Sequence, residues 1–132
     1  MLVRIYQNRW SSWEESVMSY LDLSENVLEW AFEEIEIDYV DPTVNKERKY
    51  IPDFIVVVKD GDNVKIKILE VKPSYQASLK YAEREEDRIA VRINESKWQY
   101  AKDWCLKKTE EKDIPFEFEV LTEFEIYKGE RL

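Results

Sequence analysis

Two apolar segments joined by a tight turn constrain the fold more strongly than any other feature of this sequence. Residues 50–58 (YIPDFIVVV) and 64–72 (VKIKILEVK) both have the composition of β-strands. The link between them contains Asp60-Gly61, a dipeptide that is typical of β-hairpin turns. The run 54–58 is apolar on both faces, so we expect this strand to lie in the interior of a sheet. The sequence therefore predicts an antiparallel hairpin at the centre of the fold.

The remaining segments predict helices and strands around this hairpin. Residues 11–22 carry an apolar stripe at helical spacing and begin with two possible capping serines, Ser11 and Ser12. We further expect a short helix from Ser24 to about Trp30, a half-buried strand at 34–40 near a sheet edge, some helix within 76–93, a helix at 95–109 and a last strand at 116–120. This helix-strand-strand-strand-helix-strand order predicts an α/β fold. Its mixed four-stranded sheet, flanked by helices, is expected to consist of 34–40, 50–58, 64–72 and 116–121.

Residue types that are absent or rare exclude many kinds of active site. The 132 residues include no histidine, which removes Ser-His-Asp triads, HExxH zinc sites and histidine general bases. The single cysteine, Cys105, excludes an internal disulfide and a cysteine zinc site. The only glycines are Gly61 and Gly129, so glycine-rich phosphate loops are excluded as well. An enzyme of this composition would use carboxylates, lysines, hydroxyls and a hard metal ion bound through oxygen.

Length and hydropathy predict one domain, residues 1–132, without membrane contact. No apolar run approaches the roughly 20 residues that a membrane span needs. The N-terminal sequence MLVRIYQNRW lacks the long apolar stretch of a signal peptide. We therefore expect a cytoplasmic protein.

Charged residues meet at one end of the predicted hairpin. Glu70 and Lys72 are two positions apart on one strand, so their side chains share a face. If the turn centres near Gly61, Asp53 lies opposite residue 69 or so, within one position of Glu70. Two carboxylates this close repel each other and can share a divalent cation, and an adjacent lysine can stabilise negative charge. The arrangement predicts a site for phosphodiester hydrolysis that needs no histidine.

The same residues also fit a second interpretation, a cross-strand ion pair on the surface of the sheet. Spacing alone does not separate the two interpretations. The neighbouring residues favour the site, because apolar side chains bracket the charges and indicate a buried part of the sheet, where charges are usually paired or metal-bound. These neighbours are Ile51, Phe54, Ile55, Ile68, Leu69 and Val71.

The pairing of Pro52-Asp53 with Glu70-Val71-Lys72 resembles the signature of the PD-(D/E)xK nuclease superfamily. Further segments resemble TnsA-type transposon endonucleases and tailed-phage head completion nucleases: SSWEE with YLDLSENVLEW as a first helix, RKYIPDFIVV, ILEVKP, KWQYAKDWC and FEFEVLTE. The resemblance covers most of residues 10–123. It fits the head completion nucleases best by length and by the segments from KW to LTE.

This resemblance implies a restriction-endonuclease-like core and Mg²⁺-dependent DNA cleavage, with Mn²⁺ as a substitute. By match to the motif, Asp53 and Glu70 become metal ligands, with the carbonyl of Val71 as a third. Lys72 becomes the catalytic lysine.

The acidic residue of the first helix completes the site in the resembling families, and Glu14 matches it. Glu15 is the neighbouring candidate. Either carboxylate also fits a helix-capping role, since both lie within the first turn after the capping serines. We favour Glu14 as the metal-site and catalytic residue.

The net charge of −9 bears on the expected partner, DNA, because duplex binding depends on Lys and Arg residues that displace counterions. Clustered basic residues are therefore candidates for DNA contact: Lys46, Arg48, Lys49, Arg88, Arg92, Lys97, Lys102, Lys107 and Lys108. Each also fits a solvated surface position without DNA contact, and we favour that interpretation for Lys107 and Lys108. Alternatively, an assembled partner such as phage portal or head-completion proteins presents the DNA.

The main hypothesis is a head completion nuclease that trims packaged DNA ends, in the host cytoplasm or the virion. The alternatives are a TnsA-like transposition endonuclease, against which the chain's end at Leu132 counts, and a non-catalytic virion assembly protein.

Overall fold

The computed structural model describes residues 12–127 as a sequence of ten elements. The helices are α1 (Ser12–Leu23), α2 (Ser74–Ala77), α3 (Glu85–Lys112) and α4 (Glu123–Tyr127). The strands are β1 (Val27–Phe32), β2 (Ile37–Asp41), β3 (Lys46–Tyr50), β4 (Phe54–Asp60), β5 (Asn63–Val71) and β6 (Phe116–Leu121). The predicted helix at 11–22 corresponds to α1, although Ser11, one of its two possible caps, lies outside the described residues.

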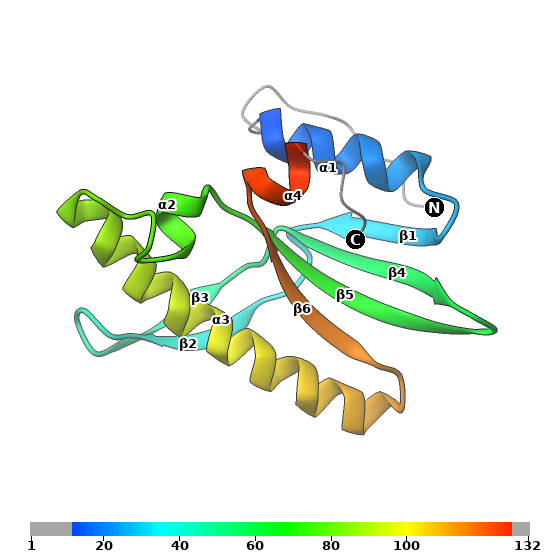
Figure 1. Ribbon diagram of the computed structural model, residues 1–132. Helices are drawn as coiled ribbons and strands as arrows, with labels where there is room; N and C mark the ends of the chain where they lie inside the picture. Colours follow the sequence, from blue (N-terminus) through cyan, green and yellow to red (C-terminus); the bar gives the residue numbers. More distant parts are fainter. Residues whose placement is uncertain (1–11, 128–132) are drawn as a thin grey trace.

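Four strands form one mixed sheet in the order β1-β4-β5-β6 (Figure 1). β4 is antiparallel to both of its neighbours, whereas β5 and β6 are parallel because the long helix α3 connects them. The predicted α/β class and mixed four-stranded sheet are confirmed, and the apolar strand β4 is an interior strand as expected. This arrangement is that of a restriction-endonuclease-like core.

The register of the β4–β5 hairpin determines which residues face each other at the end of the hairpin that carries the charged residues. Asp60 pairs with Asn63 at the turn, where Gly61 adopts a φ of 63° that suits glycine. At the other end of the hairpin, Phe54 pairs with Leu69. Continuing this register by one residue brings Asp53 opposite Glu70, one position beyond the expected residue 69.

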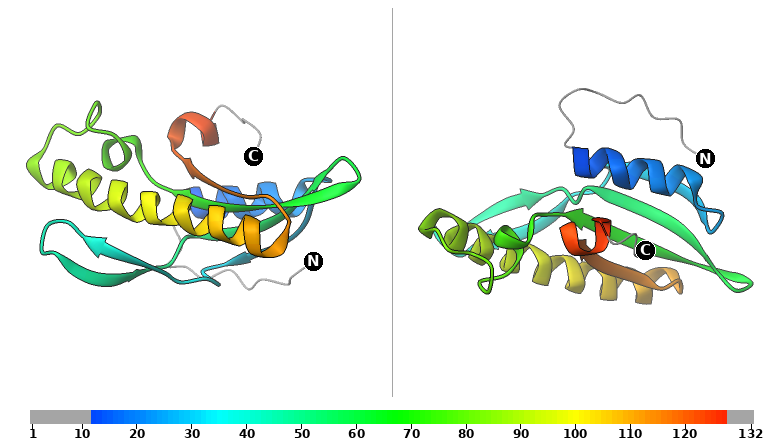
Figure 2. Two further views of the ribbon diagram at one scale, coloured as in Figure 1. Left: turned by 90° about the horizontal axis from the view of Figure 1, so that it is seen from below. Right: turned by 45° about the horizontal axis from the view of Figure 1, so that its top comes forward.

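Helices cover both faces of the sheet, as the two views in Figure 2 show. On one face, α1 packs Val17, Met18 and Leu21 against residues of β1, β4 and β5. On the other face, α3 packs against β6 and against β2, with Trp98 and Ala101 in the core. Alternation along β5 assigns its side chains to these faces. Leu69 and Val71 belong to the α1 core, so Glu70 points toward the α3 face.

The predicted short helix from Ser24 to Trp30 is wrong, because residues 27–32 form strand β1. Val27, Trp30 and Ala31 are buried, a spacing that resembles one face of a helix. In the structure this spacing results from an irregularity in the pairing of β1 with β4 between Val27 and Glu29. A bulge of this kind shifts the alternation of a strand by one position.

The strand predicted at 34–40 forms as β2, but it does not join the main sheet, so that part of the prediction is wrong. β2 pairs with β3 in a separate two-stranded antiparallel sheet, here called the ribbon (37–50). Its alternating residues Ile37 and Tyr39 are buried as predicted, yet they pack with α3. The place of this strand in the four-stranded sheet is taken by β1. The helix predicted at 95–109 is also longer than expected, since α3 begins at Glu85.

Candidate active site

Asp53 and Glu70 are brought together where β4 begins and β5 ends. Asp53 lies in the bend before β4, after the buried Pro52, and Glu70 is the penultimate residue of β5. Glu70 is 4% exposed as a whole residue, and Asp53 is half-buried. The structure thus places both predicted carboxylates on adjacent segments in a part of the molecule from which water is largely excluded.

Two hydrogen bonds cross between these segments and fix their relative position. The backbone N–H of Asp53 donates to Oε1 of Glu70 at 3.3 Å. In return, the backbone N–H of Val71 donates to Oδ2 of Asp53 at 2.7 Å. Because each carboxylate accepts a bond from the opposite segment, neither side chain is free to turn away from the other.

The proximity and burial of the two carboxylates change their protonation. Burial first, and the charge of Glu70 second, raise the pKa of Asp53 to about 8. Burial also raises the pKa of Glu70, although Lys72 and the hydroxyl of Tyr50 act in the opposite direction. Mutual repulsion therefore contributes to the raised pKa of Asp53, although burial contributes more.

Lys72 follows β5 directly and lies on the same side as Glu70. Its backbone N–H donates to the carbonyl of Leu121 at 3.0 Å, which extends the pairing of β5 with β6 by one residue. Its ammonium nitrogen lies 3.7 Å from Oε2 of Glu70. The Lys72 side chain is 29% exposed against 5% for Glu70, so the lysine lies at the mouth of the site and the glutamate in its interior.

Glu14 reaches the same region from α1. It is half-buried in the first turn of the helix, whereas Glu15 is exposed. Glu14 lies close enough to Asp53 for its charge to raise the pKa of that carboxyl. It also lines an open hollow of about 480 Å³ together with Val71, Lys72 and Tyr75. Nevertheless, no three acidic or cysteine side chains converge on one point within residues 12–127, so Glu14 borders the Asp53–Glu70 pair without joining it in one cluster.

The donor set fits a hard divalent cation. Magnesium and manganese prefer oxygen ligands, and Asp53 and Glu70 present carboxylate oxygens that burial and repulsion disfavour in their charged form. Other buried carboxylates of the described chain have their own partners. Asp41 accepts hydrogen bonds from Thr43 and pairs with Arg48, and Asp87 pairs with Arg84. The Asp53–Glu70 pair has Lys72 as its nearest cation, and a bound divalent cation would offset the remaining negative charge.

Three residues near Glu70 were not recognised as part of the site from sequence. Tyr50, at the end of β3, is 3% exposed, and its hydroxyl is buried without a hydrogen bond of normal geometry. Burial and the nearby Glu70 raise the pKa of Tyr50. Trp98 is buried with its indole N–H also unpaired, and Lys97 precedes it on α3. Lys97 stood among the candidate DNA contacts, but nothing in the sequence connected α3 to the carboxylates.

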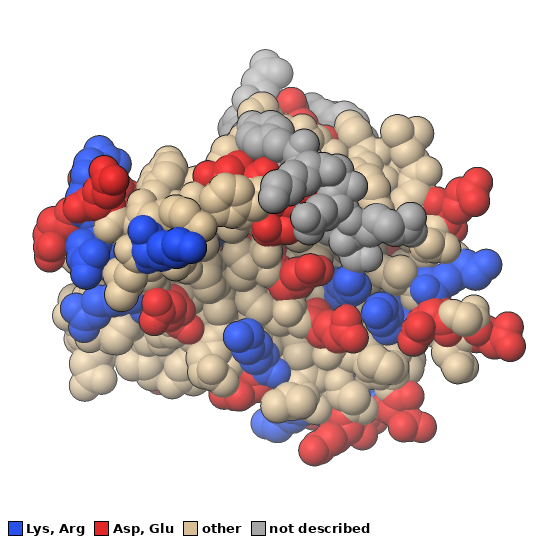
Figure 3. Space-filling view, in the orientation of Figure 1, with Lys and Arg blue, Asp and Glu red and all other residues tan. Residues whose placement is uncertain are grey.

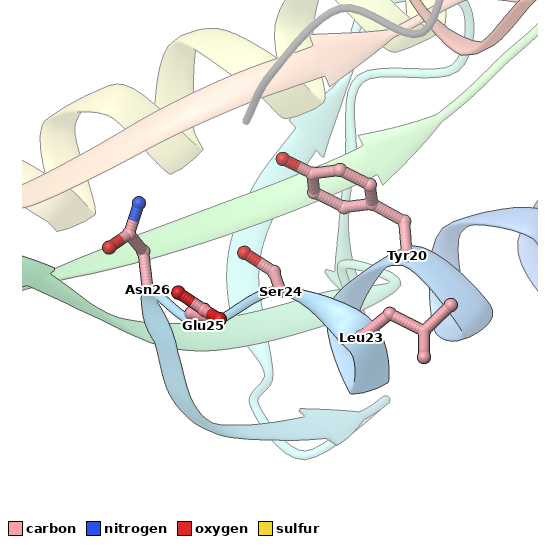
Figure 4. A pocket seen from close by; sticks show the side chains of 5 residues that line it. All are labelled: Tyr20, Leu23, Ser24, Glu25 and Asn26. Atoms are coloured by element: carbon pink, nitrogen blue, oxygen red, sulfur yellow. The ribbon is translucent and has the colours of Figure 1, made fainter.

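A second hollow, of about 360 Å³, lies at the C-terminal end of α1 (Figure 4). Tyr20, Leu23, Ser24, Glu25 and Asn26 line it. Glu25 is the only carboxylate among these residues, so this hollow lacks the paired acids found at Asp53 and Glu70. We assign no chemistry to it.

A mixed sheet whose central hairpin carries an aspartate opposite a Glu-x-Lys segment is the arrangement of PD-(D/E)xK-type nucleases. The family model for the TnsA-like endonuclease N terminal matches residues 24–123, about three quarters of the chain. The chain belongs to this family, and its nuclease character follows from that membership. Asp53, Glu70 and Lys72 lie within the matched residues, whereas Glu14 precedes them.

No curated protein and no solved structure matches the chain. Among residues 12–127, no helix has the length and apolar character needed to cross a membrane.

Proposed function

We propose that this protein is a metal-dependent DNA endonuclease that hydrolyses phosphodiester bonds, with residues 1–132 acting as a single nuclease domain. One observation carries the proposal: the half-buried Asp53 and the buried Glu70 lie side by side, each accepts a backbone hydrogen bond from the other's segment, and Lys72 lies at the mouth of the site. A surface ion pair would not be buried in this way and would match each acid with a cation. Membership in the TnsA-like endonuclease family supports the same conclusion.

In this proposal, Asp53, Glu70 and the carbonyl of Val71 hold Mg²⁺, with Mn²⁺ as a substitute. When bound, the cation lowers the pKa of a water molecule and offsets negative charge on the phosphate. Val71 holds Asp53 in place through its backbone N–H. Lys72 directs its ammonium group toward the scissile phosphate and stabilises the charge that develops on the phosphate oxygens. Glu14 supplies a further carboxylate at the edge of the site, close enough to act on the charge of Asp53.

The family match favours strand cleavage of the TnsA type over trimming of packaged phage DNA. Head completion remains a second candidate, supported by the net charge of −9. On the face shown in Figure 3, Lys and Arg side chains are interspersed with Asp and Glu. A duplex would therefore be held mainly near the site or presented by a partner, such as phage portal or head-completion proteins. For this second candidate we propose the host cytoplasm or the virion as the location, if the protein is phage-encoded.

A cleavage assay tests the proposal directly. Purified protein is incubated with duplex, single-stranded and flapped DNA in Mg²⁺, in Mn²⁺ and in EDTA, with the Asp53→Asn variant as the matched control. We expect cleavage in Mg²⁺ or Mn²⁺, none in EDTA and none with the variant. Absence of cleavage on every substrate would instead favour a non-catalytic assembly or interaction protein that retains the fold.

A further inference from the structure

Lys97 occupies a position in α3 that brings a second positive charge to the active site. α3 covers the face of the sheet toward which Glu70 points, and Lys97 lies in its middle. The Lys97 ammonium lies close enough to Glu70, Asp53 and Lys72 for their charges to act on it. The side chain is half-buried, so its charge is less screened by water than that of a surface lysine.

Two tyrosine rings hold the Lys97 side chain in place. Its ammonium nitrogen lies 5.6 Å from the ring centre of Tyr39 and 5.6 Å from the ring centre of Tyr50. Both rings are buried and belong to the two strands of the ribbon. Contacts of this kind attract a cation to the ring face and leave its N–H groups available as donors.

Ion pairing distinguishes Lys97 from several other lysines of the described chain. Lys65 and Lys67 each lie within 4 Å of a carboxylate on β6, and Lys49 pairs with Asp38. For Lys97, no carboxylate oxygen within residues 12–127 lies at ion-pair distance. Its ammonium group is therefore oriented by aromatic rings and forms no direct ion pair with a described acid, although Glu70, Asp41 and Asp53 attract it from farther away.

We propose that Lys97 binds a phosphate of the DNA strand that lies in the active site. This inference rests on the proposed DNA cleavage and adds to it a residue that contacts the substrate backbone. Asp53, Glu70 and Glu14 make the site repulsive to a phosphodiester, and the chain as a whole carries a charge of −9. A half-buried, oriented ammonium group next to the carboxylates supplies a local attraction for a phosphate.

A purely structural role is the competing explanation, in which Lys97 serves only to pack on Tyr39 and Tyr50. Binding to DNA at several salt concentrations separates the two roles. Each lysine that neutralises a phosphate contributes about one unit to the slope of log K against log salt concentration. A lysine that only supports the fold changes the melting temperature and leaves this slope unaltered.

The experiment compares Lys97→Met, which keeps the aliphatic stem, with Lys97→Arg, which keeps the charge. Lys107→Met is the matched control, because Lys107 is an exposed lysine on the same helix. Fluorescence anisotropy with a labelled duplex in Ca²⁺ measures the affinity, and gels confirm that no product forms during the measurement. Cleavage in Mg²⁺ is measured in parallel, together with the melting temperature.

We expect Lys97→Met to bind DNA roughly 10–100-fold more weakly, the range of one hydrogen bond to a charged group, and to reduce the salt slope by about one. Lys97→Arg should restore most of the affinity, and Lys107→Met should bind like the wild type. A Lys97→Met variant with the wild-type affinity and salt slope, beside a wild type that cleaves, would overturn this inference alone. A wild type that neither binds nor cleaves DNA would overturn both the proposed function and the phosphate contact.

Discussion

Lys72 and Lys97 lie near the same pair of carboxylates but belong to different elements of the fold. Lys72 follows β5 and lies 3.7 Å from Glu70, whereas Lys97 approaches from α3 on the face toward which Glu70 points. The two positive charges of the site are therefore positioned by different elements, one by the end of β5 and the other by α3. Removing one lysine leaves the other in place, so their contributions can be measured separately.

Replacing Asp53 tests whether the carboxylate pair is a metal site or a structural ion pair. Asp53→Asn should abolish cleavage, because the amide is a poor ligand for a hard cation. In metal-free buffer the variant should be as stable as the wild type or more stable, since the substitution removes a half-buried charge that is repelled by Glu70. The asparagine oxygen still accepts the bond from Val71. Melting temperatures in EDTA check this, and a clear loss of stability would favour the ion pair.

The stability of the metal-free protein should fall between pH 5 and pH 8. The pKa of Asp53 is raised to about 8 in the folded state, against 3.8 for an exposed aspartate. Between these values the folded state binds more protons than the unfolded state, so the stabilisation present at low pH is lost as the pH rises toward 8. We expect a decrease on the order of a few kcal/mol, at about 1.4 kcal/mol per pKa unit.

Urea unfolding in EDTA at pH 5, 6.5 and 8 measures this decrease. The chain contains no histidine, so no imidazole titration contributes to the result in this range. The Asp53→Asn variant serves as the control and should show a much flatter dependence on pH. Parallel curves for the two proteins would rule out Asp53 as the titrating group.

Replacing Lys72 distinguishes a catalytic lysine from an ordinary partner of Glu70. Lys72→Ala should reduce turnover by about 10²–10⁴-fold, the range for a group that stabilises charge or takes part in proton transfer. Metal affinity should be unchanged or higher, because the variant no longer places a positive charge 3.7 Å from Glu70. Single-turnover cleavage and calorimetric titration with Mg²⁺ measure the two effects. If the Lys72→Ala variant cleaved DNA at the wild-type rate, Lys72 would not be a catalytic residue, and the Glu70-x-Lys72 match to the nuclease motif would be a coincidence.

Glu14 and Glu15 offer a paired test of the first helix. Glu14 is half-buried beside the site and its charge raises the pKa of Asp53, whereas Glu15 is exposed. If Glu14 completes the site, Glu14→Gln should lose activity with little change in melting temperature, and Glu15→Gln should cleave normally. If Glu14 is only a helix cap, glutamine still serves as a partial cap. Both variants would then remain active, and the catalytic assignment of Glu14 would be wrong.

The parts of the fold that depend on local pattern could be predicted from sequence. The Asp60-Gly61 turn and two apolar runs were sufficient to place Asp53 beside Glu70, because a hairpin fixes its own register. The short helix expected from Ser24 to about Trp30 was wrong, because a possible capping serine does not show that the residues after it pair with β4 as a strand. Whether the strand 37–41 joins the main sheet depends on long-range packing, which alternation does not encode.

The same limit applies to the site. Asp53, Glu70 and Lys72 lie on one hairpin, so spacing along the chain relates them. Tyr50 and Lys97 reach the carboxylates through the packing of the ribbon on α3, and their distance in sequence from each other gives no sign of that contact. Strand β3, made of KERKY, is mostly exposed and charged, so its composition resembles a loop.

The chain runs directly from the ribbon (37–50) into the active site. Tyr50 ends the ribbon and packs beside Trp98, and only Ile51 and Pro52 separate it from Asp53. Pro52 is fully buried and its ring restricts the backbone, so this short connection behaves as a stiff link. The position of Asp53 opposite Glu70 therefore depends on the packing of the ribbon against α3 as well as on the pairing within the main sheet.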